Sequence, residues 1–183
     1  YPQAIDGQWS TFMTLAQIKE LYGLGWGVVS HSWSHRDLRS LSASDLQKEL
    51  VDSKAWIERN NFGPNDVFIV PFHSWGDRER TAIKQHYSYA RGLSVTQFWP
   101  ERFEKYPPAS PYDLTGYEPE YAPFTTAAGR AETMRVVSRA VNEGEYVDLF
   151  FHQITAEQLP HFRELMRQVA QYKSNVKTFR QAF

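Results

Sequence analysis

Apolar residues recur at helical spacing in several separate stretches of the chain. In the first stretch, Leu15, Ile18 and Leu21 form an apolar stripe. Thr14 and Gln17 stand at its start with the spacing of a capping box, in which each side chain binds the backbone of the other residue. The same reasoning predicts helices at residues 15–22, 42–59, 77–86, 129–142 and 155–172.

Short apolar runs, bounded by glycine, proline or polar residues, lie between these helices. They predict β-strands at residues 26–30, 67–70, 87–93, 146–151 and 176–179. Helices that alternate with strands indicate βα crossovers and a mostly parallel sheet. The chain is therefore predicted to be an α/β protein, and its strands are fewer than the eight of a complete (β/α) barrel.

The stretch from Pro100 to Pro123 differs from the rest because it holds six of the ten prolines. Proline lacks the backbone N–H that helices and sheets use, so we expect neither a regular helix nor a central strand here. A loop of this length inside a compact domain is more often a functional rim than a linker.

The composition is that of an ordinary globular domain. With 183 residues, of which 42% are hydrophobic and 22% charged, the chain can bury a sizeable core. A net charge of −1 means that the chain lacks the excess of basic residues typical of nucleic-acid-binding proteins. No apolar run approaches the length of a membrane helix. The chain has no cysteine, which excludes disulfides, thiolate metal sites and a cysteine nucleophile. Gly-x-Ser-x-Gly, Gly-x-Gly-x-x-Gly and Walker A sequences are absent.

Two histidines separated by three residues directly follow the predicted strand at residues 26–30. In a helical turn His31 and His35 would lie on one face, close enough to share a metal ion. Two surface histidines on a polar turn are the alternative that the spacing leaves open. The position after a strand strengthens the metal hypothesis, because α/β proteins build their sites at that edge. Neutral imidazoles suit zinc, with cobalt, nickel or iron as alternatives.

Two further clusters follow apolar strands. His152 comes after the apolar run 149–151 and is either a catalytic acid or base or a buried core histidine. Pro71, Phe72 and Trp75 come after another strand, where aromatic rings could form walls around a sugar-like ligand. An ordinary strand-to-helix turn is the simpler explanation of these three residues on their own.

Taken together, the clusters resemble the motifs of the polysaccharide deacetylase family, also called the NodB-homology family or carbohydrate esterase family 4. Residues 31–42 read His-Ser-Trp-Ser-His-Arg-Asp-Leu-Arg-Ser-Leu-Ser, similar to the family's His-Ser/Thr-x-x-His motif with its following Asp-Leu and Leu-Ser. Phe68–Gly76 is similar to the third motif, except that Val70 stands where the family often has arginine. Residues 149–152 resemble the final Leu-x-His motif.

The resemblance implies roles for individual residues and a reaction. It implies metal ligands at His31 and His35, a catalytic acid at His152, and substrate-binding residues at Pro71, Phe72, Trp75 and Phe150. The implied reaction is metal-dependent hydrolysis of N-acetyl groups on a polysaccharide or an aminosugar polymer, with zinc as the expected metal. The implied partner is an N-acetylated polysaccharide, and the implied location is secreted or in the cell envelope. A non-catalytic carbohydrate-binding or relic domain with an incomplete metal site is the alternative.

One motif of the family has no counterpart in the chain. The Thr-Phe-Asp-Asp motif supplies the general base and the third metal ligand, and Asp6 stands too close to His31 to take either role. We therefore expect residues 1–183 to form a single, N-terminally incomplete deacetylase-like catalytic domain. Its fold would be a distorted (β/α) barrel of the NodB-homology type without the first strand–helix unit. The missing segment is expected upstream of Tyr1 or on another chain.

Overall fold

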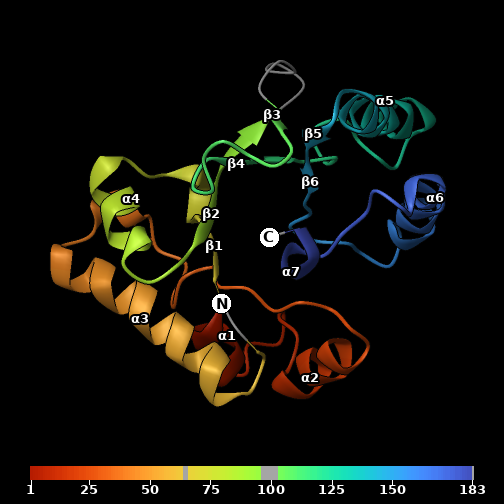
Figure 1. Cartoon of the computed structure of the whole chain (residues 1–183). Coiled ribbons are helices and arrows are strands. Elements are labelled where there is room, and N and C mark those ends of the chain that lie inside the picture. The colour runs from red at the N-terminus through yellow and green to blue at the C-terminus, as the bar shows by residue number, and fades with distance from the viewer. Residues whose placement is uncertain (64–65, 96–102, 183) are drawn as a thin grey trace. The chain divides into compact units, whose positions relative to one another are not determined.

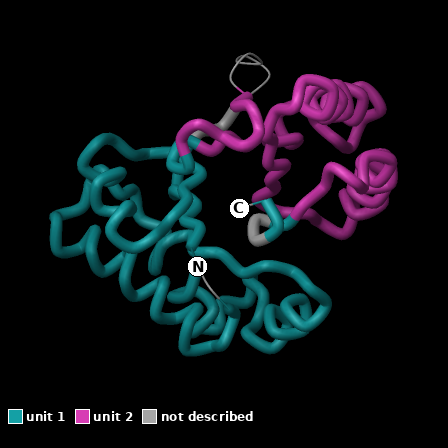
Figure 2. Tube along the Cα trace, viewed as in Figure 1, with its two compact units in different colours: residues 1–92, 111–113, 178–183 teal, residues 93–110, 114–177 magenta. Residues whose placement is uncertain are grey.

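Helices and short strands alternate along the chain (Figure 1), as the hydrophobic pattern predicts. The computed structural model describes residues 1–63, 66–95 and 103–182. These residues form two compact units (Figure 2). Unit 1 comprises Tyr1–Gly92, Pro111–Asp113 and Thr178–Phe183, and unit 2 comprises Leu93–Ser110 and Leu114–Lys177.

Unit 1 contains the helices that precede the first strand, together with the first two parallel strands. Its elements are α1 (Pro2–Asp6), α2 (Leu15–Gly23), η1 (Leu38–Ser40), α3 (Ala43–Arg59), β1 (Val67–Ile69), η2 (Pro71–His73), α4 (Asp77–Lys84), the first part of β2 (Tyr89–Val95) and α7 (Phe179–Ala182). Helix α2 begins at the predicted capping box, where the backbone N–H of Gln17 donates to Thr14 Oγ1 at 3.3 Å. Helix α3 begins in the same way, because Ser42 Oγ accepts from the backbone N–H of Asp45 at 3.1 Å. Both predicted helices are confirmed.

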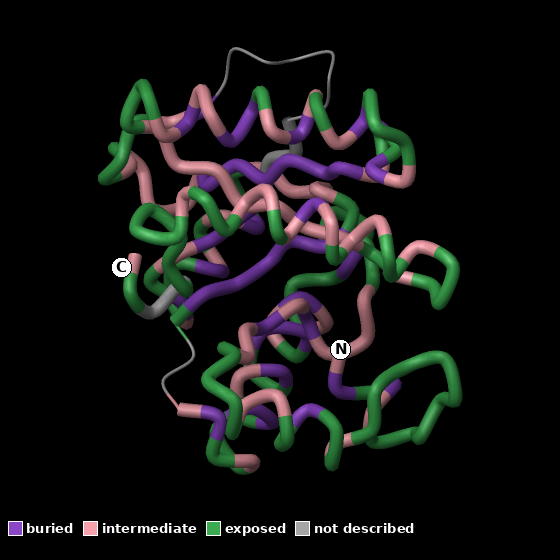
Figure 3. Tube along the Cα trace, turned by 90° about the vertical axis from the view of Figure 1, so that its right-hand side faces the viewer, coloured by how far each residue is buried: buried purple, intermediate pink, exposed green. Residues whose placement is uncertain are grey.

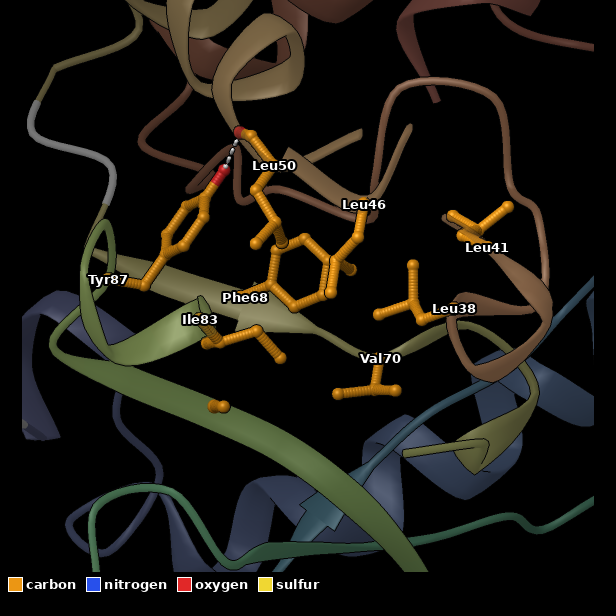
Figure 4. Close-up of a cluster of buried hydrophobic side chains, with 9 residues drawn as sticks. Leu38, Leu41, Leu46, Leu50, Phe68, Val70, Ile83 and Tyr87 are labelled. Carbon is orange, nitrogen blue, oxygen red and sulfur yellow. Dashed lines mark hydrogen bonds between the residues drawn. The ribbon is translucent and has the colours of Figure 1, made fainter. Parts of the chain in front are cut away.

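Two parallel strands carry the core of unit 1. Phe68 and Ile69 of β1 pair with Ala90 and Arg91 of β2, and Ser30 forms a single parallel bridge to Phe68. Buried side chains from the neighbouring helices pack against these strands (Figure 4). The cluster consists of Leu38, Leu41, Leu46, Leu50, Phe68, Val70, Ile83, Tyr87 and Ala90. This packing fixes the ends of the strands, from which the candidate functional residues project.

Unit 2 repeats the strand–helix–strand arrangement on a smaller scale. Its elements are β3 (Glu104–Lys105), β4 (Leu114–Tyr117), α5 (Ala127–Glu143), β5 (Glu145–Tyr146), β6 (Asp148–Leu149), α6 (Leu159–Val169) and η3 (Ala170–Tyr172). Strands β4 and β6 are parallel, while β3 and β5 form an antiparallel pair. Buried and exposed residues alternate along the helices (Figure 3). The predicted α/β class with parallel strands is therefore confirmed.

Two predicted strands differ from the structure in their extent. Of the stretch 26–30, only Ser30 pairs with a strand, while Trp26 is 62% exposed. Gly25 adopts a φ of 93°, which turns the backbone away from an extended path just before Trp26. The stretch 146–151 contains two short strands, because Tyr146 pairs with β3 and Leu149 pairs with β4.

The proline-rich stretch contains a buried strand, contrary to the prediction. All four residues of β4, Leu114–Tyr117, are buried. The strand fits between Pro111 and Pro119, where the sequence has no proline to interrupt hydrogen bonding. The prediction failed because it averaged the prolines over the whole stretch. Residues 100–102 of this stretch lie outside the described part of the chain.

The predicted closing strand at residues 176–179 is also wrong, since α7 begins at Phe179. Thr178 and Gln181 form a capping box there. The backbone N–H of Gln181 donates to Thr178 Oγ1 at 3.3 Å, and that of Thr178 donates to Gln181 Oε1 at 3.0 Å. This local cap favours a helical turn over an extended backbone. Within the described residues, no helix has both the length and the apolar composition needed to cross a membrane.

Candidate functional site

The ring nitrogens of His31 and His35 converge at the end of the short segment that pairs with β1. The two Nε2 atoms are 3.1 Å apart. His31 Nδ1 lies 2.9 Å from the carbonyl oxygen of Ile69, so it carries the proton of a neutral ring and leaves the lone pair on Nε2. Metal-binding histidines commonly donate their second ring N–H to such a carbonyl. Two nitrogens on one tetrahedral zinc ion lie roughly 3.3 Å apart, as Zn–N bonds of about 2.0–2.1 Å require.

The environment of His31 keeps its imidazole neutral. Burial lowers the pKa of His31 to about 4, against the opposing effect of its hydrogen bond to the Ile69 carbonyl. The nearby charges of His35 and Arg91 lower it further. A neutral imidazole is the form that binds a metal ion, so the donor chemistry of the pair fits a divalent metal.

The loop between the two histidines is held by helix α3. Glu49 is buried on α3 and accepts two hydrogen bonds from Ser34, one from the backbone N–H at 2.8 Å and one from the hydroxyl. Ser32 Oγ accepts from the backbone N–H of His35 at 3.0 Å. The sequence reasoning missed Glu49, although its place on the inner face of a predicted helix was a signal, because a buried carboxylate needs donors.

A second set of hydrogen bonds fixes the residue before His31. Ser30 Oγ lies 2.7 Å from Ser53 Oγ, and the hydroxyl of Tyr87 lies 3.0 Å from Ser30 Oγ. The same hydroxyl donates to the carbonyl oxygen of Leu50 at 2.8 Å (Figure 4). These groups are buried, so each hydrogen bond prevents the cost of an unpaired polar group. The loop that carries the histidines is thus anchored at its start and in its middle.

Backbone strain concentrates around the same place. Six described residues other than glycine have positive φ angles, and four of them are Ser32, His35, Phe72 and His73, at 64°, 59°, 55° and 52°. Such conformations cost about 1–3 kcal/mol each and persist where the surroundings impose them, often at ligand sites. The ring of Phe72 is 62% exposed and its centroid lies 4.6 Å from that of His35. The structure therefore brings the predicted residue Phe72 to the histidine pair.

Pro71 and Trp75 occupy different surroundings. Pro71 is buried at the start of η2. Trp75 packs against the core cluster of unit 1, and the guanidinium carbon of Arg80 lies 4.4 Å from its ring centroid. A Cβ on Gly92 would stand 2.2 Å from Trp75 Cε2, so the indole fills the space that glycine leaves. Their substrate-binding roles stay predictions.

A third ligand for the histidine pair is not evident in the part of the chain that the structure describes. Across residues 1–63, 66–95 and 103–182, no carboxylate or further histidine joins His31 and His35 in a set of three ligand atoms. Asp6 ends α1 and accepts hydrogen bonds from Trp56 Nε1 at 2.7 Å and from Arg59 at 3.0 Å. It anchors α1 to α3, which agrees with the expectation that it is not the missing acid.

His152 lies in unit 2 and pairs there with two glutamates. Its Nδ1 is 2.9 Å from Glu118 Oε1 and 3.1 Å from Glu120 Oε2, and its backbone N–H also donates to Glu120 at 3.1 Å. The ring of Phe150 is 5.7 Å from that of His152, centroid to centroid. The side chain of His152 is 67% exposed, so the interpretation as a buried core histidine is wrong.

The glutamates differ in their electrostatic surroundings. Burial raises the pKa of Glu118. Burial acts in the same direction on Glu120, but its hydrogen bonds from His152 lower its pKa overall. One ligand atom from each of the three residues lies within 4.8 Å of the others, so they form a second set that could hold a cation. Sequence reasoning missed Glu118 and Glu120 because they follow β4, the strand hidden among the prolines.

Comparisons with known proteins bear on the fold and on the first half of the chain. Residues 5–89 match the family model described as polysaccharide deacetylase. This segment contains His31 and His35 but not His152. The sequence matches no curated protein.

Two solved structures have a similar fold. One is a family 4 carbohydrate esterase from Streptomyces lividans in complex with acetate, with a TM-score of 0.57 and 14% identity over 86% of this chain and 68% of that chain. The other is the deacetylase PplD from Streptococcus pyogenes in complex with acetate, with a TM-score of 0.50 and 15% identity over 87% of this chain and 54% of that chain. At these identities the likeness establishes the fold alone. It confirms the predicted α/β fold of the NodB-homology type. The chain spans 68% of the length of the first structure and 54% of the length of the second.

Proposed function

We propose that the protein hydrolyses the N-acetyl groups of a polysaccharide or an aminosugar polymer in a metal-dependent reaction, a proposal supported by the match of residues 5–89 to the family model described as polysaccharide deacetylase. The observation that carries this proposal is the convergence of His31 and His35, whose Nε2 atoms lie 3.1 Å apart. Such a pair of imidazoles, with the ring of His31 oriented by a backbone carbonyl, is typical of a metal centre.

His31 and His35 would hold the metal, and zinc is the ion that their chemistry favours. The chemistry that such an ion supplies is polarisation of the acetyl carbonyl and a lower pKa of water. The carbonyl of Ile69 holds the ring of His31 directly. Glu49 holds the backbone of Ser34, the residue before His35. Because these groups are set before an ion arrives, little reorganisation opposes its binding.

His152 would act as the general acid. Its Nδ1 faces Glu118 and Glu120, which leaves Nε2 as the nitrogen that can donate a proton. The leaving amine of the sugar needs that proton when the amide C–N bond breaks, and the amino group stays on the glycan. The carboxylates stabilise the protonated imidazole and fix the orientation of its ring.

A non-catalytic carbohydrate-binding domain is the second candidate function. It is favoured by one observation, namely that only two ligands are brought together at the histidine pair within the described residues. A catalytic zinc site uses three protein ligands and keeps one position open. The two candidates differ in whether the chain releases acetate.

The decisive experiment measures acetate released from an N-acetylglucosamine oligomer by the zinc-loaded chain. Deacetylation predicts acetate release that disappears in the variant with His31→Ala and His35→Ala. The matched control is His86→Ala, which removes a histidine that contacts Gln47 on α3 at 2.6 Å. No acetate from the parent, together with retained binding of the oligomer, would establish the carbohydrate-binding alternative instead.

A further inference from the structure

A group of aromatic rings adjoins the candidate metal ligand His35. The ring of Tyr1 stacks on His35 with a centroid distance of 5.2 Å and an interplanar angle of 25°. The ring of Phe12 lies 5.3 Å from Tyr1, and Trp9 lies 6.1 Å from Tyr1 and 6.0 Å from Phe12. We call Tyr1, Trp9 and Phe12 the aromatic platform. It belongs to unit 1, as does the histidine pair.

Trp9 and Phe12 of the platform are exposed, whereas Tyr1 is half-buried. Trp9 is 47% and Phe12 39% exposed, whereas Ile18 of the following helix is buried in a cluster with Trp56 and Ile57. Large aromatic side chains left on the surface in contact with one another commonly mark a binding site. Phe72 lies on the same histidine and is 62% exposed, so rings flank His35 from two segments of the chain.

The turn that carries the platform is ordered by its own backbone. The N–H of Gly7 donates to the carbonyl of Gln3 at 2.9 Å, and the N–H of Phe12 donates to that of Trp9 at 3.0 Å. A Cβ on Gly7 would stand 2.8 Å from Trp9 Nε1, so the indole rests directly on the glycine backbone. The position of the Trp9 ring is therefore set before a ligand binds.

We propose that the aromatic platform is a saccharide subsite, where Trp9 and Phe12 stack on pyranose rings of the glycan next to the sugar whose acetamido group reaches His31 and His35. This inference rests on the proposed function and adds the surface that holds the polymer. Flat aromatic faces pack on the C–H faces of sugars, and aromatic side chains contribute large contact areas with few rotatable bonds. A polymer has to extend past the reacting centre, and the platform continues from one of the histidines at that centre.

The test measures affinity separately from turnover. The metal-free chain is titrated with the N-acetylglucosamine tetramer by calorimetry, and KM and kcat are measured with the zinc-loaded chain. Trp9→Ala and Phe12→Ala are each expected to weaken tetramer binding and raise KM by about fivefold, with kcat largely retained, because they remove contact area away from the reacting bond. Trp26→Ala is the matched control, since Trp26 is a 62% exposed tryptophan outside the platform.

Binding of the tetramer within twofold of the parent in both platform variants would overturn the proposal. Thermal melting checks that each variant folds, and Phe12→Ala decides the question if Trp9→Ala unfolds. The outcome is separable from that of the proposed function. Acetate release with unchanged affinity of the platform variants would refute the subsite alone, whereas Trp9-dependent binding without acetate release would refute deacetylation alone.

Discussion

Glu49 holds Ser34 through both of its carboxylate oxygens, one bound to the backbone N–H at 2.8 Å and the other to the hydroxyl. Ser34 stands directly before His35, so this contact fixes the backbone next to His35 relative to α3. Removal of this buried carboxylate would leave two hydrogen-bond donors without an acceptor, which costs folding free energy.

Replacing Glu49 should therefore weaken metal binding. In Glu49→Gln the amide keeps the size of the side chain but offers only one acceptor atom, so the loop loses one of its two hydrogen bonds. We expect zinc affinity to fall by about tenfold or more, in the range found for groups that orient metal ligands. Titration against a competing chelator measures the change. Asp52→Asn on the exposed side of the same helix is the control, and equal affinities for both variants would contradict this role for Glu49.

The contact between Trp75 and Gly92 predicts a loss of stability. A Cβ on Gly92 would stand 2.2 Å from Trp75 Cε2, which is far inside van der Waals contact. Gly92→Ala therefore forces the indole to move, and overpacking of this kind costs about 1–3 kcal/mol of unfolding free energy. Urea unfolding measures the loss. Gly23→Ala is the control, because nothing lies within 4 Å of the Cβ it would add, and similar unfolding midpoints for the two variants would argue against the packing described.

The pairing of His152 with Glu118 predicts an effect on turnover. Glu118→Gln removes the negative charge 2.9 Å from Nδ1, so the protonated imidazole is less stabilised and its ring is less firmly oriented. We expect kcat to fall by about tenfold or more with KM little changed, as for the loss of an interaction made in the transition state. Acetate release is the measurement. Glu157→Gln at an exposed position of the same unit is the control. A kcat equal to that of the parent would remove Glu118 from the mechanism.

Local signals in the sequence predicted most of the helices. The capping box at Thr14 and the helix start near Ser42 are confirmed by hydrogen bonds to the two hydroxyl groups, because a cap depends only on residues three positions apart. Strands were harder to predict, because their partners lie far along the chain. The buried strand Leu114–Tyr117 was missed, and residues 26–29 were assigned to a strand that contains only Ser30.

The candidate site was likewise predicted only in part. The spacing of His31 and His35 predicted that the two rings lie together, and the structure places their Nε2 atoms 3.1 Å apart. Glu49, Glu118 and Glu120 were not predicted, because a carboxylate becomes significant only when tertiary packing brings it to a donor. Trp9 and Phe12 escaped notice for a related reason, since a sequence with this many aromatic residues does not show which rings remain on the surface.

The central claim is that His31 and His35 hold a metal ion, and elemental analysis after dialysis tests it most directly. The account predicts zinc bound to the parent chain and to His86→Ala, and its loss from the variant with His31→Ala and His35→Ala. Glu118→Gln is measured alongside, because Glu118, Glu120 and His152 form the other set of candidate ligands. Zinc retained by the double histidine variant at the parent's stoichiometry, or lost only from Glu118→Gln, would contradict the account.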